Sequence, residues 1–173
     1  MQISPRREPK INNVKIRRDS GRNRSSMTKS PIDPPMKVMA KIETLIIHHV
    51  PVVRSGLVAL IEATGRFAVC GETDDAPTGR EMFVKNQPRL VALGLTLRRG
   101  SGFELIKDFR RLDRAARLLV VSAREDPLSI QRAFRAGTHG YFALEDDPSQ
   151  VLQALSSISE GIFMPAQASR SGF

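Results

Sequence analysis

The stretch "LIIHHVPVVRSGL", residues 45–57, passes from an apolar run into a segment with helical spacing. Pro51 suits the first turn of a helix, because that position needs no backbone N–H donor. Val53 and Leu57 follow four residues apart, which puts them on one helical face. The stretch therefore predicts a buried strand followed by an amphipathic helix, with His48 and His49 at the junction.

The same succession of apolar run and amphipathic segment recurs from residue 42 onward. Parallel strands that are covered on both faces have nearly continuous apolar sequences, as these runs do. We therefore expect an α/β fold with a doubly wound, five-stranded parallel sheet, a flavodoxin-like sandwich of three layers. The expected strands are residues 42–47, 66–71, 89–95, 117–121 and 140–144.

The segments between these runs carry helix signals. Gly137 and Gly161 stand where glycine commonly follows the end of a helix. Gly79 interrupts the second segment and weakens the helix expected there. The expected helices run from residue 51, over 77–86, through a stripe formed by Leu105, Ile106, Phe109 and Leu112, over 126–136, and from Pro148 to Gly161.

The net charge of +9 is distributed unevenly along the 173-residue chain. Residues 1–40 hold ten Lys and Arg against three acidic residues and show no periodicity, so we expect a basic disordered tail. Residues 41–163 form the expected domain, and residues 164–173 a short linker. The tail is either a weak, nonspecific attractor of nucleic acid or a solvated extension. Upstream sequence wrongly included in the chain is also conceivable, since Met27, Met36 and Met39 are alternative starts.

Composition argues against several classes of protein. The chain has no apolar run near the ~20 residues of a membrane span and no apolar stretch typical of a secretory signal, so we expect a cytoplasmic protein without membrane contact. The single cysteine, Cys70, has no partner for an internal disulfide and is expected to be a buried thiol.

Ligands of an open parallel sheet bind outside the carboxyl ends of its strands. The residues expected there include His48 and His49, then Gly94, Ser122 and Leu144. No Gly-rich phosphate loop follows the first strand, which argues against a dinucleotide fold or a P-loop. No carboxylate ends the third strand and no lysine follows the fifth, so we expect no enzymatic activity and no cofactor.

Several segments, in order and spacing, resemble the receiver domain of response regulators, above all those followed by a LuxR-type output domain. The resemblance extends over about residues 42–163, and the string "RAGTHGYF" followed by an acidic loop is its most specific part. The segments that carry it are "LIIHHVPVVRSGLVALIEA", "GETDDAPTGREMF", "QPRLVALGLTLRRGSGFELIKDFR", "RLLVVSARED", "AFRAGTHGYFALEDDP" and "VLQALSSISEGIF".

The resemblance implies a phosphoryl transfer from a histidine kinase to an aspartate on the third strand, with a divalent cation held by acidic residues and a lysine after the fifth strand. Here Gly94 stands at the phosphoacceptor position, His48 and His49 replace the acidic pair, and Leu144 replaces the lysine. Ser122 matches the hydroxyl residue that would bond the phosphoryl group. We therefore expect a degenerate pocket without phosphorylation chemistry.

Other roles for the two histidines stay open. A metal site would need a sharp turn, because neighbouring strand residues point to opposite faces, and His139 belongs to the far end of the sheet. A nucleophilic pair of Ser122 and His48 lacks an evident third group. We favour histidines that fill a former acid pocket, with neither metal nor catalytic residues.

Signalling by protein contacts is the function that we expect, through a partner or a second copy bound to the fourth helix, fifth strand and fifth helix. Tyr141, at the aromatic switch position of the resemblance, is expected either on that partner face or half-buried. "RRLDRAAR", residues 110–117, fits an acidic partner or, as we favour, a solvated helix end. The alternatives are a nucleic-acid-associated regulator that uses the basic tail and a truncated LuxR-type regulator, because few residues follow Gly161.

Overall fold

The computed structural model describes residues 40–123, 126–144 and 147–164. The chain divides into two compact units, Met1–Lys37 and Val38–Phe173, and all of the described residues belong to the second. Apart from residues 40 and 164, the tail and the linker expected from the sequence lie outside the described residues, as do Glu145 and Asp146.

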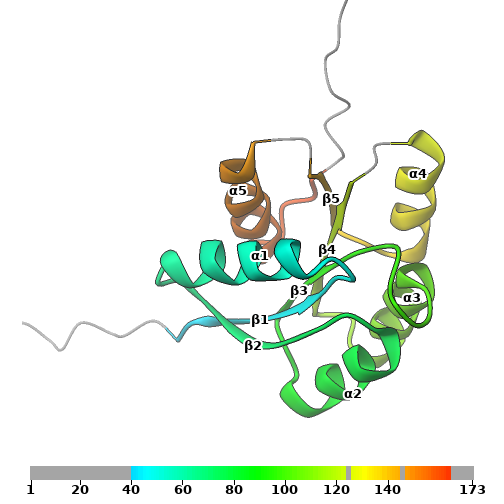
Figure 1. The fold of residues 1–173 in the computed structure, drawn as a ribbon, viewed down its shortest axis with the longest axis horizontal. Helices are drawn as coiled ribbons and strands as arrows, with labels where there is room; N and C mark the ends of the chain where they lie inside the picture. Colours follow the sequence, from blue (N-terminus) through cyan, green and yellow to red (C-terminus); the bar gives the residue numbers. More distant parts are fainter. Residues whose placement is uncertain (1–39, 124–125, 145–146, 165–173) are drawn as a thin grey trace, which may run out of the picture. The chain divides into compact units, whose positions relative to one another are not determined.

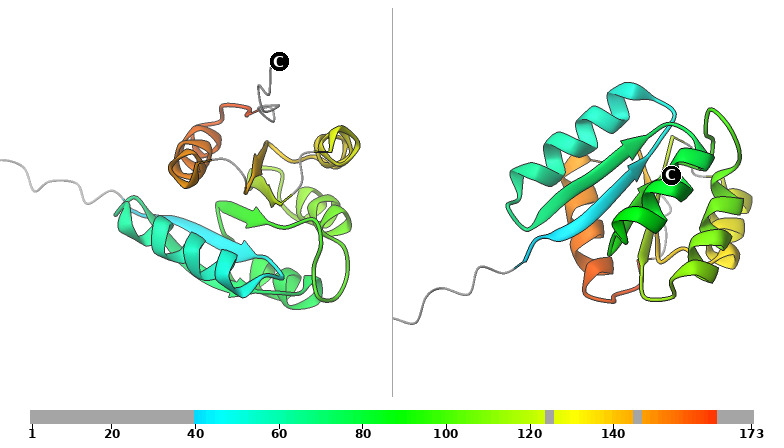
Figure 2. Two further views of the ribbon diagram at one scale, coloured as in Figure 1. Left: turned by 45° about the horizontal axis from the view of Figure 1, so that its top comes forward. Right: turned by 90° about the horizontal axis from the view of Figure 1, so that it is seen from below.

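Five parallel strands form one sheet in the order β2-β1-β3-β4-β5, and five helices cover its two faces (Figures 1 and 2). Helices α1 and α5 pack on one face, whereas α2, α3 and α4 pack on the other. The expected α/β, doubly wound fold is therefore confirmed. Its elements are β1 (Ile42–Ile47), α1 (Pro51–Ala63), β2 (Phe67–Thr73), α2 (Ala76–Asn86), β3 (Leu90–Leu93), α3 (Gly102–Leu112), β4 (Arg117–Ser122), α4 (Pro127–Ala136), β5 (Gly140–Ala143) and α5 (Pro148–Ser159).

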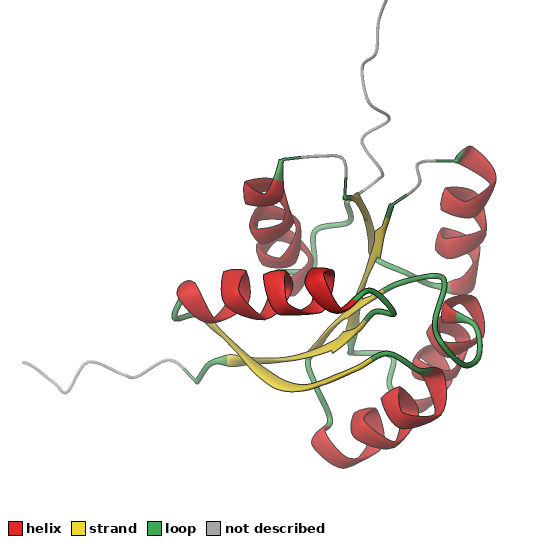
Figure 3. Ribbon diagram, viewed as in Figure 1, coloured by secondary structure: helices red, strands yellow, loops and turns green. Residues whose placement is uncertain are grey.

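Helices lie on both sides of the sheet (Figure 3). Alternation along the central strands divides the core into two halves, one on each side. In β1, Leu45 and Ile47 pack towards α2 and α3, while Ile46 between them packs towards α1 and α5. All three side chains are fully buried, and each such burial contributes about 1.5–3 kcal/mol. The need to fill both halves explains why the strands have continuous apolar sequences.

Gly79 has a packing role that the sequence did not indicate. It lies inside α2, and a Cβ built there would lie 2.7 Å from Cδ1 of Ile47. Glycine therefore lets α2 approach β1 closely, and the helix forms with Asp75 as its N-cap, whose side chain accepts from the N–H of Thr78.

The prediction was wrong for one residue that was expected in the core. Leu112, the last residue of α3, is 46% exposed, whereas Leu105, Ile106 and Phe109 are buried. The helix ends at Leu112, and the burial of the stripe ends one turn earlier, at Phe109, so helical spacing alone placed Leu112 wrongly.

None of the helices in the described part of the chain has the length and apolar character needed to cross a membrane.

Candidate functional site

A hollow of about 550 Å³ opens at the carboxyl ends of β1, β3 and β4. It brings together four of the five residues expected in the pocket, and the fifth, Gly94, lies against the ring of His48. The lining residues are His48, His49, Val50, Leu95, Thr96, Phe103, Val121, Ser122, Ala123, Asp126, Ser129 and Leu144.

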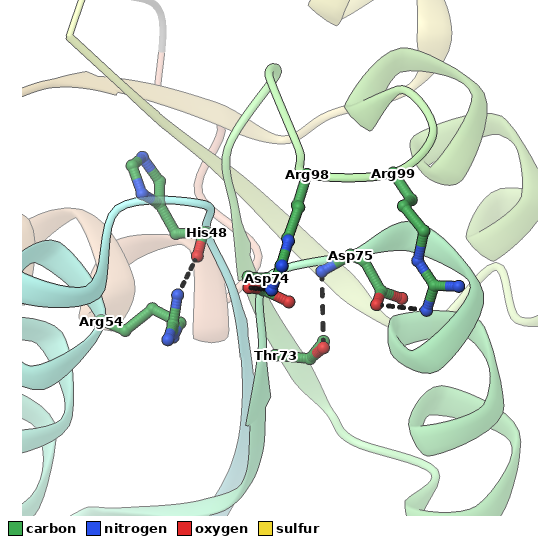
Figure 4. Close-up of polar contacts among 7 residues, drawn as sticks. All are labelled: His48, Arg54, Thr73, Asp74, Asp75, Arg98 and Arg99. Carbon is green, nitrogen blue, oxygen red and sulfur yellow. Dashed lines mark hydrogen bonds and ion pairs between the residues drawn. The ribbon is translucent and has the colours of Figure 1, made fainter.

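His48 is fixed by hydrogen bonds at the end of β1. Its backbone N–H donates to the carbonyl of Thr73 at 3.0 Å, and its own carbonyl accepts from Nη1 of Arg54 at 2.7 Å (Figure 4). The ring nitrogen Nδ1 accepts from the N–H of Val50 at 3.1 Å. Because Nδ1 accepts a hydrogen bond, the neutral ring carries its proton on Nε2.

The ring of His48 fills the space beside Gly94. A Cβ built on Gly94 would lie 2.7 Å from Cδ2 and 3.2 Å from Nε2 of His48. The backbone N–H of Gly94 is held by the carbonyl of Ile47 at 2.8 Å, so the two positions are fixed relative to each other. Any side chain at residue 94 would therefore require His48 to move.

His49 lies beside His48, contrary to the expectation of opposite faces. The two ring centroids are 5.0 Å apart, with 20° between the ring planes. The chain leaves the strand at this point, so the alternation of strand side chains no longer applies. Even so, the described residues contain no group of three or more side chains that could hold a metal ion. The third histidine, His139, accepts from the N–H of Leu118 near the amino end of β4.

The pKa of His48 is lowered from its ordinary value of 6.5 to about 4, first by burial and then by the neighbouring His49 and Arg54. The hydrogen bond with the N–H of Val50 acts on the pKa in the opposite direction, but it does not outweigh these effects. A general base that serves a serine takes the proton at Nε2 while a carboxylate accepts from Nδ1–H. In His48 the donor and acceptor roles of the two nitrogens are reversed, which argues against a nucleophilic pair with Ser122.

Leu144 brings an apolar side chain to the rim of the hollow. Its N–H donates to the carbonyl of Ser122 at 2.8 Å, which continues the β4–β5 ladder and places the two residues side by side. Leu144 is half-buried and also contacts the core under α1 and α5. No positive charge is supplied from this position.

Tyr141 corrects one expectation. It is only 5% exposed and belongs to the core cluster under α3 and α4, so its ring is buried and not half-buried. Strand β5 is buried throughout, and this places the ring inside.

An arginine clamp that the sequence analysis missed joins the β2–α2 loop to the β3–α3 loop (Figure 4). Arg99 Nη2 donates to Asp75 Oδ2 at 2.7 Å, and Arg98 Nη1 lies 3.5 Å from Asp74 Oδ2. Two backbone hydrogen bonds of 2.9 Å, from Arg98 to Asp74 and from Ala76 to Arg99, join the same loops. The hydrogen bonds from Arg99 and from the N–H of Thr78 lower the pKa of Asp75 to about 2. The pairing of "DD" with "RR" was the signal available in the sequence.

Residues 44–156 match the family model of the response regulator receiver domain. The chain belongs to this family. The receiver domain of two-component response regulators thus accounts for the fold and for the position of the hollow.

Some of its relatives are matched over almost their whole length, and others over little more than half of it. The nitrate/nitrite response regulator protein homolog of Haemophilus influenzae is 25% identical over 121 residues, 70% of this chain and 58% of that protein. Chemotaxis protein CheY of Thermotoga maritima is 26% identical over 116 residues, 67% of this chain and 96% of that protein. A LuxR-family two-component response regulator from Aurantimonas sp. SI85-9A1 has a solved structure with a TM-score of 0.70, 29% identity, and coverage of 74% of this chain and 91% of that one. The chain spans somewhat more than half of the nitrate/nitrite regulator.

The contact between His48 and Gly94 predicts a coupled effect on stability. Gly94→Ala should lower the free energy of unfolding by about 1–3 kcal/mol, because its methyl group meets the His48 ring. His48→Ala should remove most of that cost in the double variant, so the two effects should not add. Urea unfolding of the four proteins measures the coupling.

Gly56→Ala in α1 is the matched control, since a Cβ there meets nothing within 4 Å. It should raise the stability by about 0.5–1 kcal/mol through helix propensity. Strictly additive effects of Gly94→Ala and His48→Ala would show that the ring does not occupy this space.

The low pKa of His48 predicts a loss of stability in mild acid. Between pH 6.5 and about 4 the unfolded chain binds a proton at His48 that the folded protein does not, so stability falls as the pH is lowered. The expected loss from pH 7 to pH 5 is about 2 kcal/mol for this residue. His139, whose pKa is also lowered to about 4, contributes in the same window.

His48→Asn is the test, because an asparagine oxygen accepts from the N–H two residues on yet does not titrate. Its unfolding free energy should change between pH 7 and pH 5 by about 2 kcal/mol less than that of the native protein. Parallel pH profiles for the two proteins would contradict this assignment.

Proposed function

We propose that this receiver domain takes no phosphoryl group at its third strand and acts in two-component signalling through protein contacts. One observation carries the proposal: the His48 ring occupies the space that a side chain at residue 94 would need. Glycine offers no carboxylate for an acyl phosphate, so the domain lacks the nucleophile at the position that matches the family's phosphoacceptor. In this proposal the protein is cytoplasmic and is not an enzyme.

The lining of the hollow also disfavours a magnesium ion. Mg²⁺ prefers oxygen ligands in a near-octahedral array, whereas His48 and His49 offer ring nitrogens. The carboxylate of Asp126, which also lines the hollow, already caps α4 by accepting from the N–H of Ser129 at 2.8 Å. Leu144 adds no charge to offset a phosphoryl group. The nucleophile, the cation site and the countercharge therefore all depart from the family's pattern.

Restoring phosphorylation should require all of these parts together. Gly94→Asp alone should accept no phosphoryl group, because its side chain meets His48 and has no acidic partner for Mg²⁺. Gly94→Asp combined with His48→Asp, His49→Asp and Leu144→Lys frees the space and supplies the cation ligands and the countercharge. Intact-mass measurement after incubation with acetyl phosphate and Mg²⁺ should show added phosphoryl mass in the combined variant only.

Without the cation, the transition state loses several kcal/mol of charge stabilisation, which corresponds to a rate reduction of roughly a thousandfold. Phosphorylation of the single variant should therefore stay below detection. A phosphoryl mass on the native protein that is removed by hydroxylamine would refute the proposal. Asp74 or Asp75 would then be the first candidates, although both are engaged by arginines.

We further propose that partners or a second copy dock on α4, β5 and α5. Leu128 on α4 is 63% exposed and supplies an apolar contact, whereas Tyr141 is buried and supports this face from within. Because no phosphoryl group shifts the domain between two states, the contact should not respond to phosphodonors.

Crosslinking of the full chain, in native extract or at high concentration, should place contacts on α4 and leave them unchanged by acetyl phosphate. Leu128→Asp should weaken the association at least tenfold, while Val52→Asp on α1, where Val52 is 76% exposed, is the matched control. Crosslinks centred on α1, or an affinity that depends on acetyl phosphate, would contradict the assignment.

A further inference from the structure

A row of basic residues lies along the amino-terminal edge of the sheet, opposite the hollow. Arg66 precedes β2, Lys41 precedes β1, Arg89 precedes β3, and Arg117 begins β4. These strands are neighbours in the order β2-β1-β3-β4. With strands about 4.8 Å apart, the row extends over roughly 15 Å.

Backbone hydrogen bonds fix the main chain at these strand ends. The N–H of Ile42 donates to the carbonyl of Arg66 at 3.0 Å, and the N–H of Arg117 donates to the carbonyl of Arg89 at 2.9 Å. The strand register places Arg89 two residues further along the strand direction than Lys41, so the row is stepped between β1 and β3.

A cleft of about 630 Å³ opens beside the row and is lined by three arginines. The only carboxylate in its lining is that of Glu160, which pairs with Arg66 at 2.7 Å. The lining residues are Ala40, Ile42, Thr64, Gly65, Arg66, Arg89, Arg117, Ser159 and Glu160.

Two arginines of the cleft retain their hydrogen-bonding capacity. Within the described residues, the guanidinium groups of Arg89 and Arg117 make no hydrogen bond or ion pair, and neither does the ammonium group of Lys41. Arg110, by contrast, donates to the carbonyls of Arg114 and Ala116 and so is already engaged in closing the turn after α3. The segment 110–117 is therefore only partly a solvated helix end.

The positive charge of this edge acts on a neighbouring residue. His139, just before β5, has a pKa lowered to about 4, first by burial and then by the charges of Arg110 and Arg117. His139 is neutral at pH 7 and adds no charge of its own, so the field at the edge arises from the arginines and Lys41.

We propose that this edge binds the phosphates of a nucleic-acid backbone without reading its bases. Guanidinium groups match phosphate oxygens in bidentate geometry, and a row of cations across neighbouring strand ends suits a linear polyanion. The cleft lining has no aromatic ring on which a base would stack, so contacts are confined to the backbone. None of the exposed large hydrophobic side chains of the described residues lines the cleft, which disfavours a protein partner there.

The site is distinct from the receiver hollow, and it does not depend on the proposed loss of phosphorylation. Residues 1–39 are the same in all point variants of the full chain, so any share that they have in binding cancels when those variants are compared. Only the contribution of the edge changes between those variants.

Fluorescence anisotropy with a labelled DNA duplex of arbitrary sequence, between 50 and 200 mM salt, tests the site in the full chain. Arg89→Gln combined with Arg117→Gln should reduce the slope of log affinity against log salt by about 2, because about one counterion contact is lost for each arginine. Arg80→Gln is the matched control, since Arg80 is exposed on α2 away from the edge. It should leave the slope unchanged.

Because Arg117 is half-buried, Arg89→Gln alone is included and should reduce the slope by about 1. Unfolding midpoints establish that each variant is folded. Equal slopes for the native and edge variants, or an equal loss in Arg80→Gln, would overturn the proposal. So would competition by polyglutamate that equals competition by unlabelled DNA per unit charge.

Discussion

The imidazole of His48 and the missing side chain of Gly94 occupy one space, and the character of the hollow depends on this contact. The ring is held by the N–H of Val50 at Nδ1, and the residue's carbonyl is held by Arg54. These bonds hold His48 in place, and burial lowers its pKa so that the side chain is neutral at pH 7. It fills the end of β1, where the family resemblance would place an acid. A histidine at this position therefore differs in both shape and charge from the acid that the resemblance implies.

The two ends of the sheet differ in the charged groups that they present. At the carboxyl edge, the ring nitrogens of His48 and His49 stand in place of carboxylates, and Asp74 and Asp75 are paired with arginines. At the amino edge, Arg89 and Arg117 face a cleft with one carboxylate. We propose that the carboxyl edge takes no phosphoryl group, whereas the amino edge binds the phosphates of a polyanion.

Most of the fold was predictable, because strands that are buried on both faces of a sheet appear in the sequence as continuous runs of apolar residues. The apolar runs located all five strands, with observed bounds that differ by at most two residues, and the order of the pocket residues followed from the strand ends. The sequence could not show where side chains go once regular structure stops. The stacking of His49 on His48, the burial of Tyr141, the close approach at Gly79 and the exposure of Leu112 all depend on contacts between segments distant in sequence or on the end of an element.

We propose that the native hollow accepts neither a phosphoryl group nor its mimic, because His48 fills the space at Gly94. The most direct measurement is an amide NMR titration of the full, native chain with Mg²⁺ and beryllofluoride, followed at residues 48, 94 and 122. The account predicts that these amide resonances do not shift with either addition. Saturable shifts at these three positions, at concentrations that leave the amino edge unaffected, would contradict it.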